Sequence, residues 1–195
     1  MDPRGAKAYI LARLKRELDP ARTYHSFHHT IDVYASAITI GEMEGVTGEE
    51  LELLKTAALF HDSGFLLDDM DHEAASCTLV SEVLPGYGFS PDQVLRIRTM
   101  IMATRLPQGP EDHLARILCD ADLDYLGRAD FRLIGDTLFQ EMVAFGQLRT
   151  EREWNELQVR FIRAHRYFTR TNREHREPGK QENLQEVEQW LQRHP

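Results

Sequence analysis

The sequence predicts an all-α fold, because helical periodicity dominates it and signals for strands are scarce. Apolar residues recur at steps of three and four along most of the chain, whereas alternating runs of β-branched residues are few. Residues typical of helix starts stand where several of these stretches begin. They are Thr47 with Glu50, Thr150 with Glu153, and Ser90 followed by Pro91. We therefore expect a bundle of helices around a single apolar core.

Glycine, proline and aspartate interrupt the periodicity and set the expected helix ends. The expected helices span residues 4–18, 27–44, 49–62, 72–84, 91–105, 111–125, 130–148, 151–170 and 180–193. The strongly charged stretch after residue 170 predicts a solvated linker and helix face, and an apolar stripe that includes Trp190 then predicts the last helix. We expect that helix either to dock on the bundle or to bind a partner.

The composition is that of a globular protein of one domain, and it restricts the class of partner. A chain of 195 residues, 42% hydrophobic and 28% charged, suits a single domain over residues 1–195. The formal net charge of −9 disfavours a nucleic acid polymer as partner, although local arginines and a metal ion leave a small phosphorylated substrate open. No apolar run has the length of a membrane span or the pattern of a signal peptide, so we expect no membrane contact and a cytoplasmic location. Cys77 and Cys119 are expected to be buried free thiols.

Two histidines lie at the ends of apolar helical stripes. His29 precedes Val33 by one helical turn, and His61 extends the stripe of Ala58 in the same way. Both imidazoles are therefore expected to point toward the core. A single histidine in such a place is more commonly a hydrogen-bonded core residue than a metal ligand, so the interpretation depends on what accompanies the pair.

Aspartates accompany both histidines. Asp62 directly follows His61, and a turn-forming role is the alternative for it, since Ser63-Gly64 comes next. Asp122 continues an apolar helical stripe at a step of four, whereas Asp120 lies off that stripe, so periodicity favours Asp122. A buried carboxylate needs a cation or several hydrogen-bond donors.

Two imidazoles and two carboxylates predict a site for one divalent transition metal. A mixed nitrogen and oxygen set suits Mn, Fe, Co, Ni or Zn better than Mg or Ca. Four protein ligands leave open positions for water and substrate on a six-coordinate ion. An open position is typical of a catalytic site rather than of a purely structural one.

Three blocks of sequence together resemble the HD-domain metal-dependent phosphohydrolases. The blocks are Tyr24-His25-x-x-x-His29-Thr30-x-x-Val33, His61-Asp62-Ser63-Gly64 and Asp120-Ala121-Asp122-Leu123. They cover about residues 20–135, which would form an HD-domain-like core with extra C-terminal helices, residues 136–195, packed on it. The resemblance implies that the metal ligands are His29, His61, Asp62 and Asp122.

The resemblance also implies an activity, namely hydrolysis of a small and nucleotide-like phosphoester as a phosphomonoesterase or phosphodiesterase. In such a reaction the ion activates a water molecule, and Asp62 or Asp122 orients it. Family members with two metals carry further histidines, one of them near the end of the fifth helix. This chain has Met102-Ala103-Thr104-Arg105 there, so a second metal is permitted but not favoured.

The first block is also similar to that of the cyclic-nucleotide phosphodiesterases, which are distant relatives. That likeness implies that His25 is a general acid that protonates the leaving oxygen, and that His29 rather than His28 binds the metal. The alternative for His25 is a hydrogen bond at the helix start.

Four further residues are candidates for substrate binding. His72 and Glu73 follow the His61-Asp62 block and are expected to line the pocket, the alternative being N-terminal helix capping. Arg105 and Arg128 could each pair with a substrate phosphate, because a guanidinium offers paired donors, although most arginines are solvated surface residues.

Two other classes of function compete with hydrolysis. One is a non-catalytic regulatory module that binds a nucleotide or a partner protein, and the acidic last helix favours it. The other is a di-iron oxygenase of the HD type, which the missing sixth ligand near Thr104 disfavours. The apolar stripes of the terminal helices also permit a homodimer.

Overall fold

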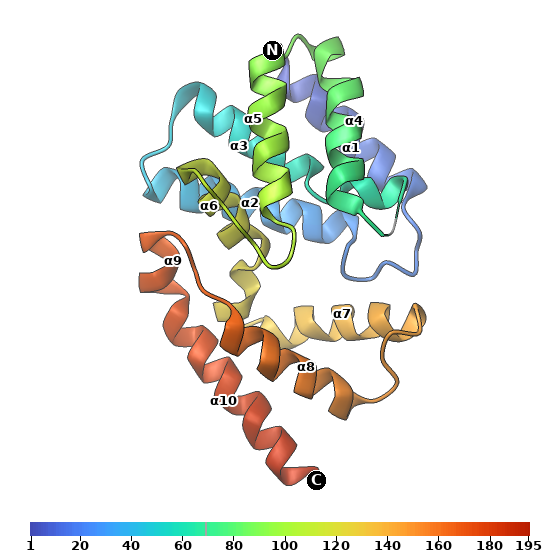
Figure 1. Ribbon diagram of the computed structural model, residues 1–195, viewed down its shortest axis with the longest axis vertical. Helices are drawn as coiled ribbons and strands as arrows, with labels where there is room; N and C mark the ends of the chain where they lie inside the picture. The colour runs from blue at the N-terminus through green and yellow to red at the C-terminus, as the bar shows by residue number, and fades with distance from the viewer. Residues whose placement is uncertain (69) are drawn as a thin grey trace.

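Helices make up most of the computed structural model, which describes residues 1–68 and 70–195 (Figure 1). Within these residues no strand is found, so the predicted all-α fold is confirmed. The α-helices are α1 (Pro3–Glu17), α2 (Phe27–Met43), α3 (Gly48–Phe60), α4 (His72–Val83), α5 (Pro91–Ala103), α6 (His113–Asp122), α7 (Phe131–Ala144), α8 (Glu151–Ala164), α9 (Arg170–His175) and α10 (Glu177–Arg193). Short 3-10 helices follow α3, α4 and α6: η1 (Ser63–Leu66), η2 (Leu84–Tyr87) and η3 (Asp124–Gly127).

The predicted helix starts form with one exception. Ser90 and Thr150 each complete a capping box with the glutamine or glutamate three residues later. Thr47 stands at the start of α3 but makes no side-chain cap. The carboxylate of Glu50, its expected partner, accepts a hydrogen bond of 2.7 Å from Arg96 on α5.

The first six helices surround one apolar core. It fills the upper part of the molecule in Figure 1 and takes buried side chains from each of α1 to α6. Helix α3 runs through its middle, with Leu53, Leu54, Ala57 and Ala58 wholly buried. This packing fixes the C-terminal end of α3, where His61 follows, against α2 and α6.

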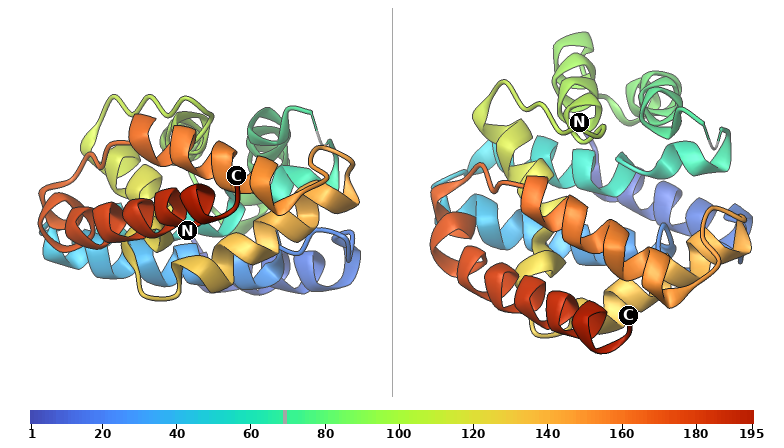
Figure 2. Two further views of the ribbon diagram at one scale, coloured as in Figure 1. Left: turned by 90° about the horizontal axis from the view of Figure 1, so that it is seen from below. Right: turned by 60° about the horizontal axis from the view of Figure 1, so that its bottom comes forward.

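Helices α7 to α10 form the lower part of the molecule around a second, smaller apolar cluster. Helix α10 lies along α8 and against η3, as both views in Figure 2 agree. Two glycines allow the approach to η3: a Cβ atom on Gly127 would lie 2.2 Å from the carbonyl oxygen of Arg176, and one on Gly179 would lie 2.4 Å from that of Gly127. Helix α10 therefore starts at Glu177, before the expected residue 180, with Pro178 in its first turn.

The charged stretch after residue 170 is helical rather than the linker that the sequence predicts. It forms α9, and its Asn172 is buried and donates a hydrogen bond of 3.1 Å to Asp124. Arg176 pairs with the same carboxylate at 2.7 Å. Asn172 and Arg176 thus join α9 to η3 through hydrogen bonds, whereas Arg170, Arg173 and His175 are exposed, as expected for a solvated helix face.

Asp120 anchors the chain where it leaves α8. Its carboxylate is wholly buried and accepts hydrogen bonds of 2.8 Å from the backbone of Phe168, and of 2.8 and 2.6 Å from the backbone and hydroxyl of Thr169. Burial raises the pKa of Asp120 to about 6, although these hydrogen bonds lower it.

Among the described residues no helix has both the length and the apolar composition needed to cross a membrane.

Replacing Asp120 with asparagine should weaken this anchor. In Asp120→Asn the amide nitrogen would face one of the backbone N–H donors and leave it unpaired, so we expect the free energy of unfolding to fall by about 1–3 kcal/mol. Urea denaturation followed by circular dichroism measures this. Asp136→Asn, at an exposed position on α7, is the matched control and should change stability by less than about 0.5 kcal/mol. Equal stability of the two variants would contradict the anchoring role.

Candidate metal centre

His61 follows the last residue of α3 with its ring wholly buried. Its Nδ1 lies 2.8 Å from the carbonyl oxygen of Ala58, and because a carbonyl can only accept, Nδ1 carries the proton. In the neutral form, which is the form that binds a metal, the lone pair is therefore on Nε2. Nε2 points to the place where α2 and α6 meet the end of α3.

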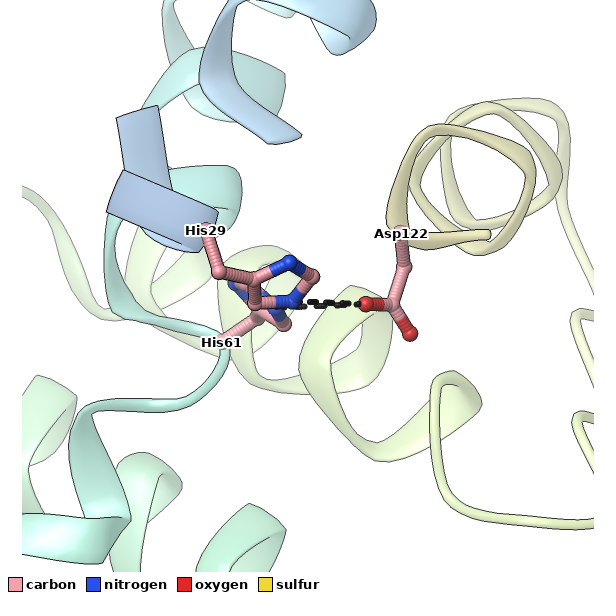
Figure 3. Close-up of side chains that lie close together, drawn as sticks. All are labelled: His29, His61 and Asp122. Carbon is pink, nitrogen blue, oxygen red and sulfur yellow. Dashed lines mark hydrogen bonds and ion pairs between the residues drawn. The ribbon is translucent and has the colours of Figure 1, made fainter. Parts of the chain in front are cut away.

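His29 and Asp122 meet His61 from two other helices. His29 lies in the first turn of α2, and its Nε2 is 3.4 Å from His61 Nε2. Asp122 ends α6, and its Oδ1 lies 3.2 Å from His29 Nε2 and 3.4 Å from His61 Nε2. Figure 3 shows the two imidazoles together on one side and the carboxylate facing them from the other.

Asp62 closes the group. Its Oδ2 lies 3.2 Å from His61 Nε2 and 3.4 Å from His29 Nε2, and it is buried without a hydrogen bond. The four predicted ligands are thus brought together, as donors from three separate helix ends. His28 is exposed, in line with the choice of His29, and Asp120 faces away from the group.

Gly64 and Ser76 hold the turn that presents Asp62. The backbone N–H of Gly64 donates to Ser76 Oγ at 2.7 Å, and that hydroxyl donates to the carbonyl of His61 at 2.7 Å. A Cβ atom on Gly64 would lie 1.8 Å from the carbonyl oxygen of His72, so only glycine lets α4 come this close. The Ser63-Gly64 sequence therefore forms a turn and serves the site as well.

The charges of the group balance in the absence of a metal. Burial lowers the pKa of His29, but the adjacent carboxylates of Asp122 and Asp62 outweigh it and raise the pKa to about 9. The pKa of His61 is raised well above its ordinary value in the same way, against burial, chiefly by the charge of Asp62. Burial raises the pKa of Asp122, but hydrogen bonds from both imidazoles hold it at about 2.

These donors fit a divalent transition metal. Two carboxylates and two imidazoles converge, and within the described chain His29, His61 and Asp122 offer ligand atoms that all lie within 4.8 Å of one another. The unbonded Oδ2 of Asp62 is a buried acceptor that a cation would satisfy. Nitrogen and carboxylate oxygen in equal number suit Mn, Fe, Co, Ni or Zn.

His25 stands beside this centre, held by a residue that sequence analysis missed. Glu141 on α7 accepts a hydrogen bond of 2.6 Å from His25 Nδ1 and others from the backbone of Tyr24 and His25, at 2.9 and 3.0 Å. Arg22 pairs with the same carboxylate at 2.9 Å. Glu141 follows Leu138 on the inward stripe of α7, and a carboxylate in such a position was the signal that could have revealed it.

His72 and Glu73 lie on the other side of Asp62, at the start of α4. His72 Nε2 is 3.5 Å from Asp62 Oδ1 and 3.4 Å from Glu73 Oε1, and its ring stacks on Phe65 with centroids 4.1 Å apart. The N-cap of α4 is Asp71 rather than either of them. Burial lowers the pKa of His72.

The two predicted arginines have different positions. Arg105 is half exposed, pairs with Asp71 and lies 3.7 Å from Glu73. It lines the cavity described below. Arg128 is not brought to that cavity: its guanidinium pairs with Asp32 at 2.9 Å and with Asp130 at 2.8 Å. Both of its faces are occupied by carboxylates, and we propose no substrate contact for it.

Gln108 is a second neighbour that the sequence did not reveal. Its amide nitrogen lies 3.5 Å from Asp122 Oδ2 and 3.3 Å from the carbonyl oxygen of Cys119. It lies in a loop without helical periodicity, where nothing in the sequence distinguishes one polar residue from another.

A cavity of about 720 Å³ opens beside the centre. Its wall includes His25, Asp62, His72, Arg105 and Asp122. Residues that can bind a metal, a proton and a phosphate therefore share one cavity, which is the usual form of a small-molecule site.

Comparison with known proteins agrees with this arrangement. The family model for the HD domain matches residues 26–124. No curated protein matches the chain. Among solved structures, the fold is similar to that of a predicted HD superfamily hydrolase from an uncultured Thermotogales bacterium, with a TM-score of 0.63 and 23% identity over 98% of this chain and 92% of that one.

Metal binding to the metal-free protein should release protons. The raised pKa values of His29 and His61 mean that both imidazoles are charged at pH 7, whereas a metal ligand must be neutral, so about two protons should leave per ion. Affinity should accordingly increase as the pH rises from 6 to 9. Calorimetric titration with Mn or Zn in buffers of different ionisation enthalpy gives the proton count.

The variant His28→Ala is the control for this titration, because it removes an exposed histidine next to the centre. It should leave both the proton count and the affinity unchanged. Metal binding without proton release would contradict the paired, charged state of the two buried imidazoles.

Proposed function

The chain belongs to the HD-domain family, and from that membership and the arrangement of the site we propose that it is a metal-dependent phosphohydrolase acting on a small phosphoester. The observation that carries the proposal is the shared cavity. Its wall holds Asp62 and Asp122, which converge with His29 and His61, and it also holds His25, whose Nε2 makes no hydrogen bond within the described part of the chain. Fold similarity alone would not give this combination.

The metal centre is the part of the site that handles negative charge. A divalent ion bound by His29, His61, Asp62 and Asp122 would lower the pKa of a water molecule and polarise a phosphoryl oxygen. The protein fixes the orientation of the ligand side chains. Ala58 orients His61, Gln108 contacts Asp122, and the turn at Gly64 fixes Asp62.

His25 is proposed as the proton donor to the leaving group. Because the Glu141 carboxylate accepts from Nδ1, the ring of His25 can hold a second proton on Nε2, and the carboxylate stabilises that charged form. In the proposed hydrolysis water adds to phosphorus, the bond from phosphorus to the alcohol oxygen breaks, and that oxygen takes the proton of His25. The products are the alcohol and inorganic phosphate.

Arg105 and His72 are proposed to hold the substrate phosphate on the side away from Glu141, the carboxylate partner of His25. Arg105 is already paired with acidic groups, which keep its guanidinium directed along the cavity wall. A substrate phosphate would compete for the same donors, as guanidinium and phosphate oxygens pair well.

Removal of ligands should abolish both metal binding and hydrolysis. Protein purified without chelator should contain about one equivalent of transition metal per chain and release phosphate from phosphomonoesters, with Mn, Co, Ni and Mg tested in turn. We expect His61→Ala combined with Asp62→Ala to lose the metal and to reduce kcat/KM to near background while circular dichroism stays unchanged. His28→Ala is the control with full activity.

Two results would overturn the proposal. The presence of two iron equivalents without phosphate release would favour oxidative chemistry. Absence of both metal and turnover would leave a binding module as the better account.

Glu141→Gln tests the role of the carboxylate behind His25. The amide cannot stabilise a charged imidazole, so kcat should fall by about tenfold or more, less than the 10²–10⁴-fold expected for His25→Ala. Glu182→Gln, exposed on α10, serves as the control. An unchanged kcat in Glu141→Gln would show that Glu141 does not act through His25.

A further inference from the structure

The cavity beside the metal centre has two unlike walls. Residues up to Asp122 supply its polar wall, which includes Arg105 and two of the proposed metal ligands, Asp62 and Asp122. Helices α7 and α8 supply the opposite wall. Side chains of the two helices enclose the space that remains between them, which we call the apolar chamber. Its lining includes Leu138, Met142, Trp154, Leu157, Phe161 and Ile162.

The chamber offers almost nothing to a polar ligand. The lining residues of α7 and α8 all lie within the described chain. Apart from the indole N–H of Trp154, the one polar side-chain group among them is the amide of Gln158. Its amide nitrogen is already bonded to Asn155 at 3.2 Å. Leu106, at the opposite wall, is 60% exposed and lines the cavity too, so apolar surface continues outward.

A nucleoside would find few hydrogen-bond partners in this chamber. The edge of a base and the hydroxyls of a ribose need several hydrogen-bond partners, and burying such groups unpaired is costly. An aliphatic chain has no such requirement, and each buried methylene improves binding. A volume of about 720 Å³ is large for a phosphate alone and lies within the range that encloses a drug-sized ligand.

We propose that the substrate is the phosphomonoester of an aliphatic alcohol, with the phosphate at the metal centre and the chain in the apolar chamber. This inference rests on the proposed function, whose phosphate position it uses. It changes the expected substrate class from nucleotide-like to amphiphilic. The alcohol oxygen would then lie between the two walls, where His25 can protonate it as the bond to phosphorus breaks.

The chamber can be tested without any turnover. Alkylphosphonates have a carbon–phosphorus bond in place of the ester and are not hydrolysed in this way, and Trp154 in the chamber wall reports occupancy through its fluorescence. The chain has two tryptophans, so the measurement is made in a Trp190→Phe background. With metal-loaded protein, we expect the Kd to fall by about fourfold for each added methylene between butyl- and decylphosphonate, below micelle concentrations.

One helix supplies both the test variant and its matched control. Leu138→Asp places a charge in the chamber and should flatten the dependence of Kd on chain length. Leu133→Asp makes the same change on the same helix at a site that is 71% exposed, and it should leave that dependence intact. Circular dichroism of both variants verifies folding, and a smaller change, Leu138→Ala, should flatten the dependence partly if the aspartate variant fails to fold.

Parallel assays of hydrolysis separate this inference from the function on which it rests. Chain-length-dependent binding of phosphonates together with hydrolysis of decyl phosphate in preference to 5'-nucleotides supports both. Such binding without release of phosphate from any ester leaves the chamber assignment standing and removes the proposed activity. Hydrolysis of 5'-nucleotides with no effect of alkyl chain length overturns the chamber assignment and leaves the phosphohydrolase.

Discussion

The placement of two carboxylates below the protein surface is the constraint on which this molecule depends. Asp62 and Asp122 lie against His29 and His61, and each charge is stable there only because an opposite charge is within about 3.5 Å. Three helix ends must therefore meet at one point, and the apolar core of the first six helices provides the rigidity that this requires. A bound cation would take over the compensation that the imidazoles supply in its absence.

Opposite faces of helix α6 contribute to the metal centre and to the attachment of the C-terminal helices. Asp122 points to the metal centre, whereas Asp120, about 200° away around the helix, holds the chain that leaves α8. One helical turn thus attaches the C-terminal helices to the same element that carries a proposed ligand. The glycine contact between η3 and α10 provides a second attachment, so the wall formed by α7 and α8 is supported from two sides.

The sequence was sufficient to predict the fold and the central group of side chains, because both follow from helical periodicity. His29, His61 and Asp122 could be selected as the inward members of apolar stripes, and Asp62 by its place beside His61. Glu141 could not be predicted because it is 116 residues from His25 in the sequence, and a local pattern does not encode which segments meet. Gln108 could not be predicted because it lies in a loop without helical periodicity. For Arg128 the residue type was suggestive, but the two acidic partners that occupy it could be known only from the structure.

The last turns of α7 carry two kinds of contact at once. Leu138 and Met142 line the chamber, and Glu141, from the same turn, holds the ring of His25. A ligand that presses on the first two side chains acts on the backbone that carries the third. Selectivity among substrates would then be expressed in the rate of proton transfer as well as in affinity, so that a poorly fitting molecule is bound and released without reacting.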